Sequence, residues 1–169
     1  SIAKGTKQQL KATGTYSDSS TQDLTTTVAW ASTKVAVATV SNASGSEGLA
    51  TSVAVGTTAI SATKGSVSGS TALTVTAATL VSIAVTPTNS VIALGTKKQL
   101  TATGIYTDST TQDLTATATW SSTKPSVAAV SNAAGSAGLA TSVATGNTTI
   151  TAAFGSMFGS TTLSVTAAT

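Results

Sequence analysis

The sequence lacks cysteine, histidine and arginine altogether. Without cysteine there is no disulfide framework, and no thiolate is available as a nucleophile or metal ligand. Without histidine, the side chain that most often transfers protons near neutral pH is missing. These absences argue against hydrolytic and thiol-based catalysis, and we predict that the chain is not an enzyme and uses no cofactor.

Charge is also scarce, because Lys, Asp and Glu together make up 8% of the chain. The net charge of +3 comes from scattered lysines, of which only Lys97 and Lys98 are adjacent. Nucleic-acid readers cluster their positive charge and depend on arginine for bidentate contacts. We therefore expect no nucleic-acid partner.

Long apolar runs are missing too. The chain has no stretch of about 18 apolar residues that would span a bilayer, so we expect no direct membrane insertion. It does have 40% hydrophobic residues, which is enough to bury a core. Thr, Ser, Ala and Gly fill most other positions, and β-branched Thr favours exposed strands over helices.

The strongest signal is an internal repeat of 90 residues. Of the 79 positions that align between residues 1–79 and 91–169, 53 are identical without any gap, which indicates duplication. Tyr16, Trp30 and Gly65 align with Tyr106, Trp120 and Gly155. The chain is therefore predicted to contain two copies of one domain, residues 1–79 and 80–169.

Within each copy, apolar and polar residues alternate between short clusters of Gly, Asn, Asp and Ser. This period of two predicts seven or eight short strands per copy, which is typical of an immunoglobulin-like β-sandwich. Two rows are expected to face inward, Leu100, Ala102, Gly104 and Tyr106, and Leu114, Ala116, Ala118 and Trp120. We expect Trp30 and Trp120 to fill the centre of each core rather than form exposed platforms for sugars.

The sequence GIYTDSTTQDLTATATWSSTKPSVAAVS, at residues 104–131, resembles the bacterial immunoglobulin-like domain, group 2, of the invasin and intimin type. GLATSVATGNTTITA at residues 138–152 and the closing TTLSVTA fit the same family. The resemblance implies an all-β fold of two tandem sandwiches. It also implies a bacterial cell-surface or extracellular location, although such domains also occur in secreted enzymes and phage virions.

The two copies differ at their starts. Residues 80–89 form a predicted first strand that ends at Pro87, whereas Ser1 aligns with Val91. The first copy therefore lacks its N-terminal strand, either because the sequence represents part of a longer chain or because a neighbour donates the strand. An unpaired sheet edge invites pairing with another chain, so we expect protein partners or self-assembly through this edge.

The copies also join directly, since Val75–Thr79 continues into Leu80 without a Gly, Ser or Pro linker. We expect a stiff rod, because such a connection allows little freedom.

Five carboxylates are available for chemistry. Asp18 with Asp23, repeated as Asp108 with Asp113, are candidate calcium ligands, because calcium prefers hard oxygen donors. The alternative is that they cap turns through bonds to nearby backbone N–H groups.

A second candidate contact arises where Lys64, Val67 and Ser68 of the first copy become Phe154, Met157 and Phe158 in the second. Lysine at the equivalent position indicates a solvent-exposed hairpin tip, and exposed aromatic clusters often mark contact surfaces. Local packing is the other interpretation.

Together these features predict a non-catalytic structural or adhesive module, acting as a rigid spacer or assembly unit of a bacterial surface protein or filament. The alternatives are an accessory module of a secreted enzyme that binds surface glycans, and a decoration domain of a phage virion.

Overall fold

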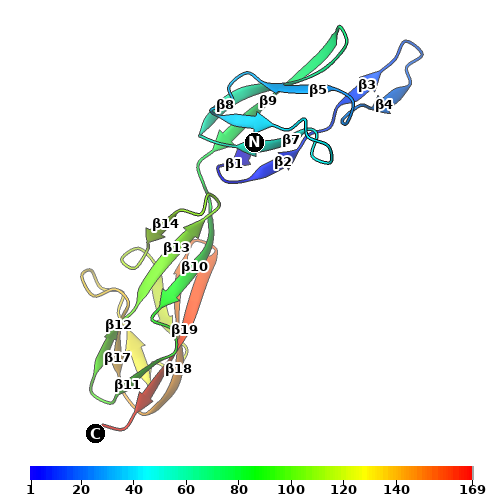
Figure 1. The fold of residues 1–169 in the computed structure, drawn as a ribbon. Helices are drawn as coiled ribbons and strands as arrows, with labels where there is room; N and C mark the ends of the chain where they lie inside the picture. Colours follow the sequence, from blue (N-terminus) through cyan, green and yellow to red (C-terminus); the bar gives the residue numbers. More distant parts are fainter. Residues whose placement is uncertain (169) are drawn as a thin grey trace. The chain divides into compact units, whose positions relative to one another are not determined.

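The computed structural model describes residues 1–168, which form strands and turns throughout. The chain divides into two compact units, Ser1–Thr79 (unit 1) and Leu80–Thr169 (unit 2) (Figure 1). Each is a sandwich of two β layers, which confirms the all-β fold of two immunoglobulin-like domains.

Unit 2 shows the complete domain. Its first layer has the order β11-β19-β18-β15, formed by Ser90–Ala93, Met157–Thr166, Gly146–Phe154 and Thr119–Ser122. The second layer contains the sheets β10-β13-β14 and β12-β17-β16. Their strands are Leu80–Thr86, Thr101–Tyr106 and Thr111–Asp113, and Lys97–Gln99, Leu139–Ser142 and Ala128–Val130.

The core of unit 2 lies between these layers. Leu100 and Ala102 on the β12–β13 segment are fully buried, as are Ile150 on β18 and Leu163 on β19. The alternation of apolar residues thus places one face of each layer inward, as period-two patterning predicts. Trp120 on β15 is 3% exposed and belongs to the same cluster, which confirms its predicted place in the core.

Unit 1 repeats this arrangement with shorter elements. The first layer has the order β1-β9-β8-β5, formed by Ile2–Ala3, Val67–Thr76, Gly56–Lys64 and Ala29–Ser32. The other sheets are β2-β7-β6 (Lys7–Gln9, Leu49–Ser52 and Ala38–Val40) and β3-β4 (Thr13–Thr15 and Thr21–Asp23).

Residues 1–79 contain no strand equivalent to β10 of unit 2, as predicted. In unit 2, β10 lies alongside β13 and pairs antiparallel with it from Leu80 to Thr86 (Figure 1). Within the described part of unit 1, β3 pairs only with β4. The strand itself is also shorter, since β3 has 3 residues and β13 has 6.

One predicted inward row is wrong in part. Ala116 is exposed, because Leu114–Ala118 is a turn in which the N–H groups of Thr117 and Ala118 both donate to the Leu114 carbonyl. This turn returns Ala118 to the core, where it is 6% exposed. Alternation therefore holds in the strands on either side but not through the turn.

The structure predicts unequal effects of one core substitution in the two units. Leu100→Ala should lower the free energy of unfolding of unit 2 by about 2–5 kcal/mol, because it leaves a closed cavity. Leu10→Ala, at the equivalent half-buried position, should cost clearly less. Urea denaturation followed by tryptophan fluorescence measures both, with Trp30→Phe or Trp120→Phe to isolate each unit. Equal losses would contradict the difference in packing.

Candidate functional site

A groove of about 550 Å³ opens in unit 1 at the place that β10 occupies in unit 2. One side is the free edge of β3, with Ala12 and Gly14, and the other is β9 around Gly69. The floor contains core side chains of the sandwich, among them Leu24, Val28, Trp30 and Ile60.

The side chains around this groove are less buried than their equivalents. Leu24 and Ala12 are half-buried, whereas Leu114 is 2% exposed and Ala102 is fully buried. Thr71 is exposed in unit 1, while Thr161 is 5% exposed in unit 2. Because each of these three pairs of positions carries the same residue, the presence of β10 in unit 2 accounts for the difference.

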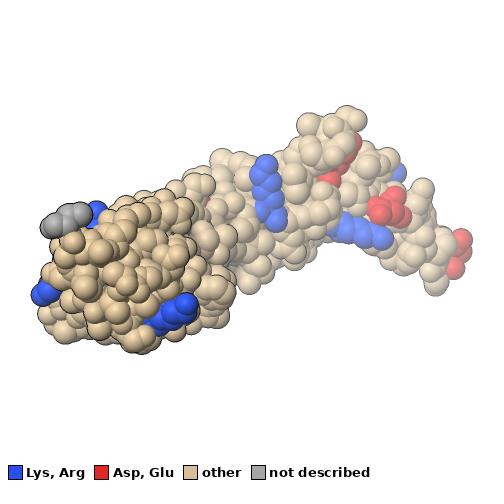
Figure 2. Space-filling model, turned by 90° about the horizontal axis from the view of Figure 1, so that it is seen from below, with Lys and Arg blue, Asp and Glu red and all other residues tan. Residues whose placement is uncertain are grey.

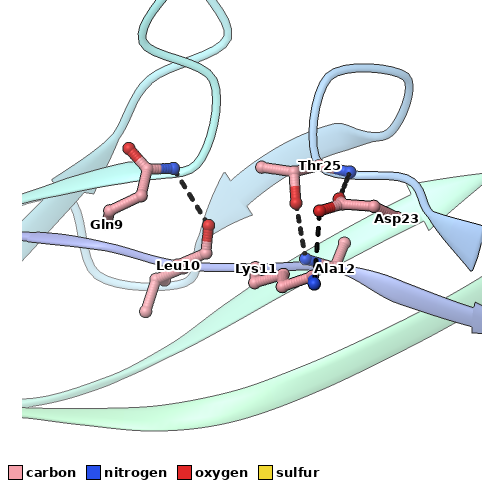
Figure 3. Close-up of polar contacts among 6 residues, drawn as sticks. All are labelled: Gln9, Leu10, Lys11, Ala12, Asp23 and Thr25. Atoms are coloured by element: carbon pink, nitrogen blue, oxygen red, sulfur yellow. Dashed lines mark hydrogen bonds and ion pairs between the residues drawn. The ribbon is translucent and has the colours of Figure 1, made fainter.

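Polar contacts join the segment before β3 to the turn after β4 (Figure 3). The Ala12 N–H donates to Thr25 Oγ1 at 3.0 Å, and the Thr25 N–H donates to Asp23 Oδ1 at 2.9 Å. Lys11 Nζ lies 3.4 Å from Asp23 Oδ2. Hydrogen bonds from the side chain and backbone of Thr25 lower the pKa of Asp23 below its ordinary value, so the carboxylate is ionised at neutral pH.

The other carboxylates have similar positions in turns. Asp18 Oδ1 accepts bonds from the N–H and hydroxyl of Ser20, and these bonds lower its pKa. Asp108 accepts from Thr110, and Asp113 from the Thr115 N–H, as their equivalents do. Asp18 precedes β4 and Asp23 ends it, so the two lie at opposite ends of that strand. Residues 1–168 contain no group of three or more His, Cys, Asp or Glu side chains suited to a metal.

The calcium hypothesis stays a prediction with a direct test. If Asp18 and Asp23, or Asp108 and Asp113, bind calcium, millimolar calcium should raise the melting temperature, because a ligand bound to the folded state stabilises it. The doubly substituted chain Asp18→Asn, Asp108→Asn should lose this increase. Identical melting curves in calcium and in chelator would remove calcium from consideration.

The aromatic substitutions of unit 2 lie at the tip of the β18–β19 hairpin. Phe154 pairs directly with Met157 across the Gly155–Ser156 turn, so their side chains share one face. Phe158 follows Met157 and lies on the opposite face, where it is 72% exposed. The predicted hairpin tip is therefore correct, and the three side chains present apolar surface on both of its faces.

Most of the visible molecular surface is uncharged. Figure 2 shows isolated lysines among other residues over most of this face, with the acidic residues gathered toward one end, where they lie close to a lysine. In residues 1–168, every buried side-chain nitrogen or oxygen has a hydrogen-bond partner. Thr148, for example, is 3% exposed and accepts a bond from the Lys124 N–H at 3.0 Å.

Gly69 and Gly159 are site residues that the sequence reasoning missed. A Cβ at Gly159 would overlap the carbonyl oxygen of Ile83 on β10, whereas a Cβ at Gly69 would meet nothing within 4 Å. The sequence did contain a signal for these residues, namely a glycine inside a predicted strand in both copies. Such a glycine often marks the close approach of another backbone.

The chain belongs to the bacterial Ig-like domain (group 2) family. The family model matches residues 1–75 and 80–165, one match in each unit. This confirms the resemblance drawn from the motifs.

A curated relative is Ice-binding protein 1 of Shewanella frigidimarina (strain NCIMB 400), which is 45% identical over 167 residues. The match covers 99% of this chain and spans 18% of the length of that relative.

Solved structures share the fold at lower identity. Domains 1–6 of the surface layer protein SbsC match with a TM-score of 0.50 and 23% identity, covering 93% of this chain and 23% of that one. The insect immune protein hemolin matches with a TM-score of 0.49 and 12% identity, covering 99% and 44% of the two chains. No helix within residues 1–168 is long and apolar enough to cross a membrane.

Proposed function

We propose that this chain is a non-catalytic structural module of a bacterial surface protein, in which tandem immunoglobulin-like domains act as a rigid spacer. The observation that carries the proposal is the close joining of two repeated units of the same fold. Strand β9 ends at Thr76 and β10 begins at Leu80, so three residues connect the units. Such a connection restricts domain motion far more than a flexible Gly/Ser linker does.

The chemistry of the surface supports the same role. The carboxylates accept hydrogen bonds within turns, and the buried polar groups of the described residues are paired, so none has the signature of a tuned catalytic group. Membership of the bacterial Ig-like family, and fold likeness to a surface layer protein, support a location outside the cell.

The relative named Ice-binding protein 1 is much longer than the matched segment, which spans 18% of its length. A segment of this size is consistent with a spacer that positions a separate binding domain. Strand donation from a partner is the proposed means of assembly.

The spacer role predicts a narrow distance between the units. The chain has no cysteine, so Ser44→Cys and Ala134→Cys at equivalent exposed turns allow specific spin labelling. Electron-electron resonance should give one narrow distance distribution. Inserting four Gly-Ser pairs between Ala78 and Thr79 should broaden it about twofold, because that linker behaves as a flexible coil. A distribution equally broad with and without the insertion would overturn the rigid spacer.

The hairpin tip of unit 2 is the proposed adhesive contact. It exposes Phe154 by 40%, Met157 by 36% and Phe158 by 72%, and such apolar surface on a loop is typical of contact sites.

Restoring the unit 1 residues provides a matched test of this contact. The variant Phe154→Lys, Met157→Val, Phe158→Ser should weaken self-association about tenfold in sedimentation velocity, because the exposed aromatic surface is removed. Its unfolding midpoint should stay close to that of the parent, since the equivalent hairpin folds in unit 1. Unchanged self-association would assign the three residues to local packing.

Glycan binding remains the alternative function, favoured by the exposed aromatic rings at the hairpin tip. Binding of the isolated chain to a glycan array, lost in the same triple variant, would favour an accessory module of a secreted enzyme.

A further inference from the structure

The outward face of β15, β18 and β19 in unit 2 is lined by hydroxyl groups. Alternate residues of these strands are buried, among them Trp120, Ile150 and Leu163, so their neighbours point to solvent. Strand pairing sets the outward residues side by side in two rows, Ser121–Thr151–Ser160 and Thr149–Thr162. The hydroxyls are therefore spaced about 5 Å apart between strands and about 7 Å apart along them.

These outward hydroxyls are available to a ligand. Within residues 1–168, the hydroxyls of Thr151, Ser160 and Thr162 make no hydrogen bond to another protein group. The inward-facing Thr148, in contrast, bonds Ser122 and the Lys124 N–H. Each outward hydroxyl can donate one hydrogen bond and accept others, so the face can bond a partner at several points.

An aromatic ring lies at the end of the hydroxyl rows, near the tip of the long β18–β19 hairpin (Figure 1). Phe158 precedes Ser160 by two residues on β19, so both point outward, and the ring is 72% exposed. Its cross-strand neighbour is the small Ala153. Phe154 and Met157 belong to the other face of the hairpin, so Phe158 is the only ring of this outward surface, which we call the hydroxyl face.

The hydroxyl face carries no charge. Strands β15, β18 and β19 contain no Lys, Asp or Glu. A nucleic acid or another polyanion needs clustered cationic side chains for its phosphates or sulfates, and a cationic partner needs carboxylates. The ligand that matches this face is therefore neutral and itself rich in hydroxyl groups.

The equivalent face of unit 1 lacks most of this chemistry. Unit 1 has alanine at four positions where unit 2 has Thr or Ser, and serine where unit 2 has the ring. These residues are Ala29, Ala31, Ala59, Ala72 and Ser68, equivalent to Thr119, Ser121, Thr149, Thr162 and Phe158. In the other direction, two outward threonines of unit 1 become Asn147 and Ala153 in unit 2. The two units share a fold and differ on this face, so unit 1 is a control within the same chain.

We propose that the hydroxyl face of unit 2 binds a neutral polysaccharide chain. The Phe158 ring stacks on one sugar, because its π-face is electron-rich and the C–H groups of a sugar are weakly positive. The hydroxyls of Ser160 and Thr162 exchange hydrogen bonds with the sugars that follow. From Phe158 to Thr162 the face extends roughly 14 Å along β19, which accommodates a short run of sugar units.

A protein is the less favoured occupant of this face. Protein interfaces are built around a core of several apolar, aromatic or arginine side chains. The hydroxyl face has one such side chain, Phe158, among small hydroxylated ones. The inference goes beyond the spacer role, because it assigns a class of ligand and the face that binds it.

The first experiment measures binding of the full chain, labelled through Ser44→Cys in unit 1, to immobilised polysaccharides. Dextran, β-glucan and galactomannan are the neutral probes, and heparin and alginate are the acidic ones. We expect saturable binding to at least one neutral probe, with an affinity that is the same at low and high salt, because no charge takes part. Binding confined to the acidic probes, binding that salt abolishes, or no binding to any neutral probe would each overturn the proposal.

Matched variants locate the site on one face of the hairpin. Phe158→Ser restores the unit 1 residue and should weaken binding to the neutral probe at least about tenfold, because the stacking ring is removed. Thr151→Val removes one hydroxyl and keeps the side-chain shape, so it should weaken binding about threefold to tenfold. The control Phe154→Lys, Met157→Val changes the opposite face and should leave binding unchanged. Binding that survives Phe158→Ser, or is lost in the control, would overturn the proposal.

Transfer of the hydroxyl face to unit 1 keeps the test decisive if a variant of unit 2 unfolds. The transfer variant gives unit 1 the outward residues of unit 2: Ala29→Thr, Ala31→Ser, Ala59→Thr, Thr63→Ala, Ser68→Phe and Ala72→Thr. Calorimetric titration with a short oligosaccharide of the neutral probe that binds should give two sites per chain, against one in the parent. A single site in both chains would overturn the proposal.

The remaining outcomes separate this inference from the other proposals. Self-association that Phe158→Ser abolishes, in a chain that binds no neutral probe, would assign the face to a protein contact and overturn the inference. If a neutral probe binds but the spin-label distances are broad, the ligand stands and the spacer fails. If the distances are narrow but no neutral probe binds, the spacer stands and this inference fails.

Discussion

Each unit depends on one tryptophan that is tied to both layers of the sandwich. The side chain of Asn132 accepts a bond from the Trp120 N–H at 2.6 Å and donates to its carbonyl at 2.9 Å. The indole N–H donates to the Thr115 carbonyl at 2.9 Å, so the buried ring leaves no polar atom unpaired. Gly138, with φ of 76°, allows the chain to pass against the ring, where a built Cβ would lie 2.9 Å from it. Unit 1 repeats these contacts through Asn42 and Thr25.

Much of this architecture followed from the sequence, because alternation and repetition are properties of the sequence itself. The duplication predicted two domains, and the parity of Leu100 and Ala102 identified the inner face. The predicted alternation of buried and exposed residues was wrong where the backbone leaves the extended conformation. The turn at Leu114–Ala118 exposes Ala116, and the bulge after Leu80 exposes Val81. A turn and a bulge both depart from the regular extended strand, and a period of two does not encode either departure.

The groove was predictable only as a missing strand. The shape of the groove could be seen only in the structure. Gly69 and Gly159 are the same residue at equivalent positions, and they differ only in what lies beside them. The same holds for Leu24 and Leu114, one half-buried and one enclosed. These identical residues in two environments show that the burial of a side chain depends on the neighbouring strands as well as on the residue type. The turn carboxylates were easier to foresee, since an Asp two residues before a Ser or Thr commonly bonds that residue's N–H.

The hydroxyl network around Thr148 has a consequence for the conditions under which such a domain works. Thr148 is bonded to Ser122 at 2.8 Å and to the Lys124 N–H at 3.0 Å, and Thr58 occupies the same position in unit 1. These bonds join neutral groups, and dissolved ions screen only interactions between charges. With 8% charged residues in all, the fold gains little from ion pairs and loses little when they are screened. The screening of charges by dissolved salt should therefore change the stability of this fold very little.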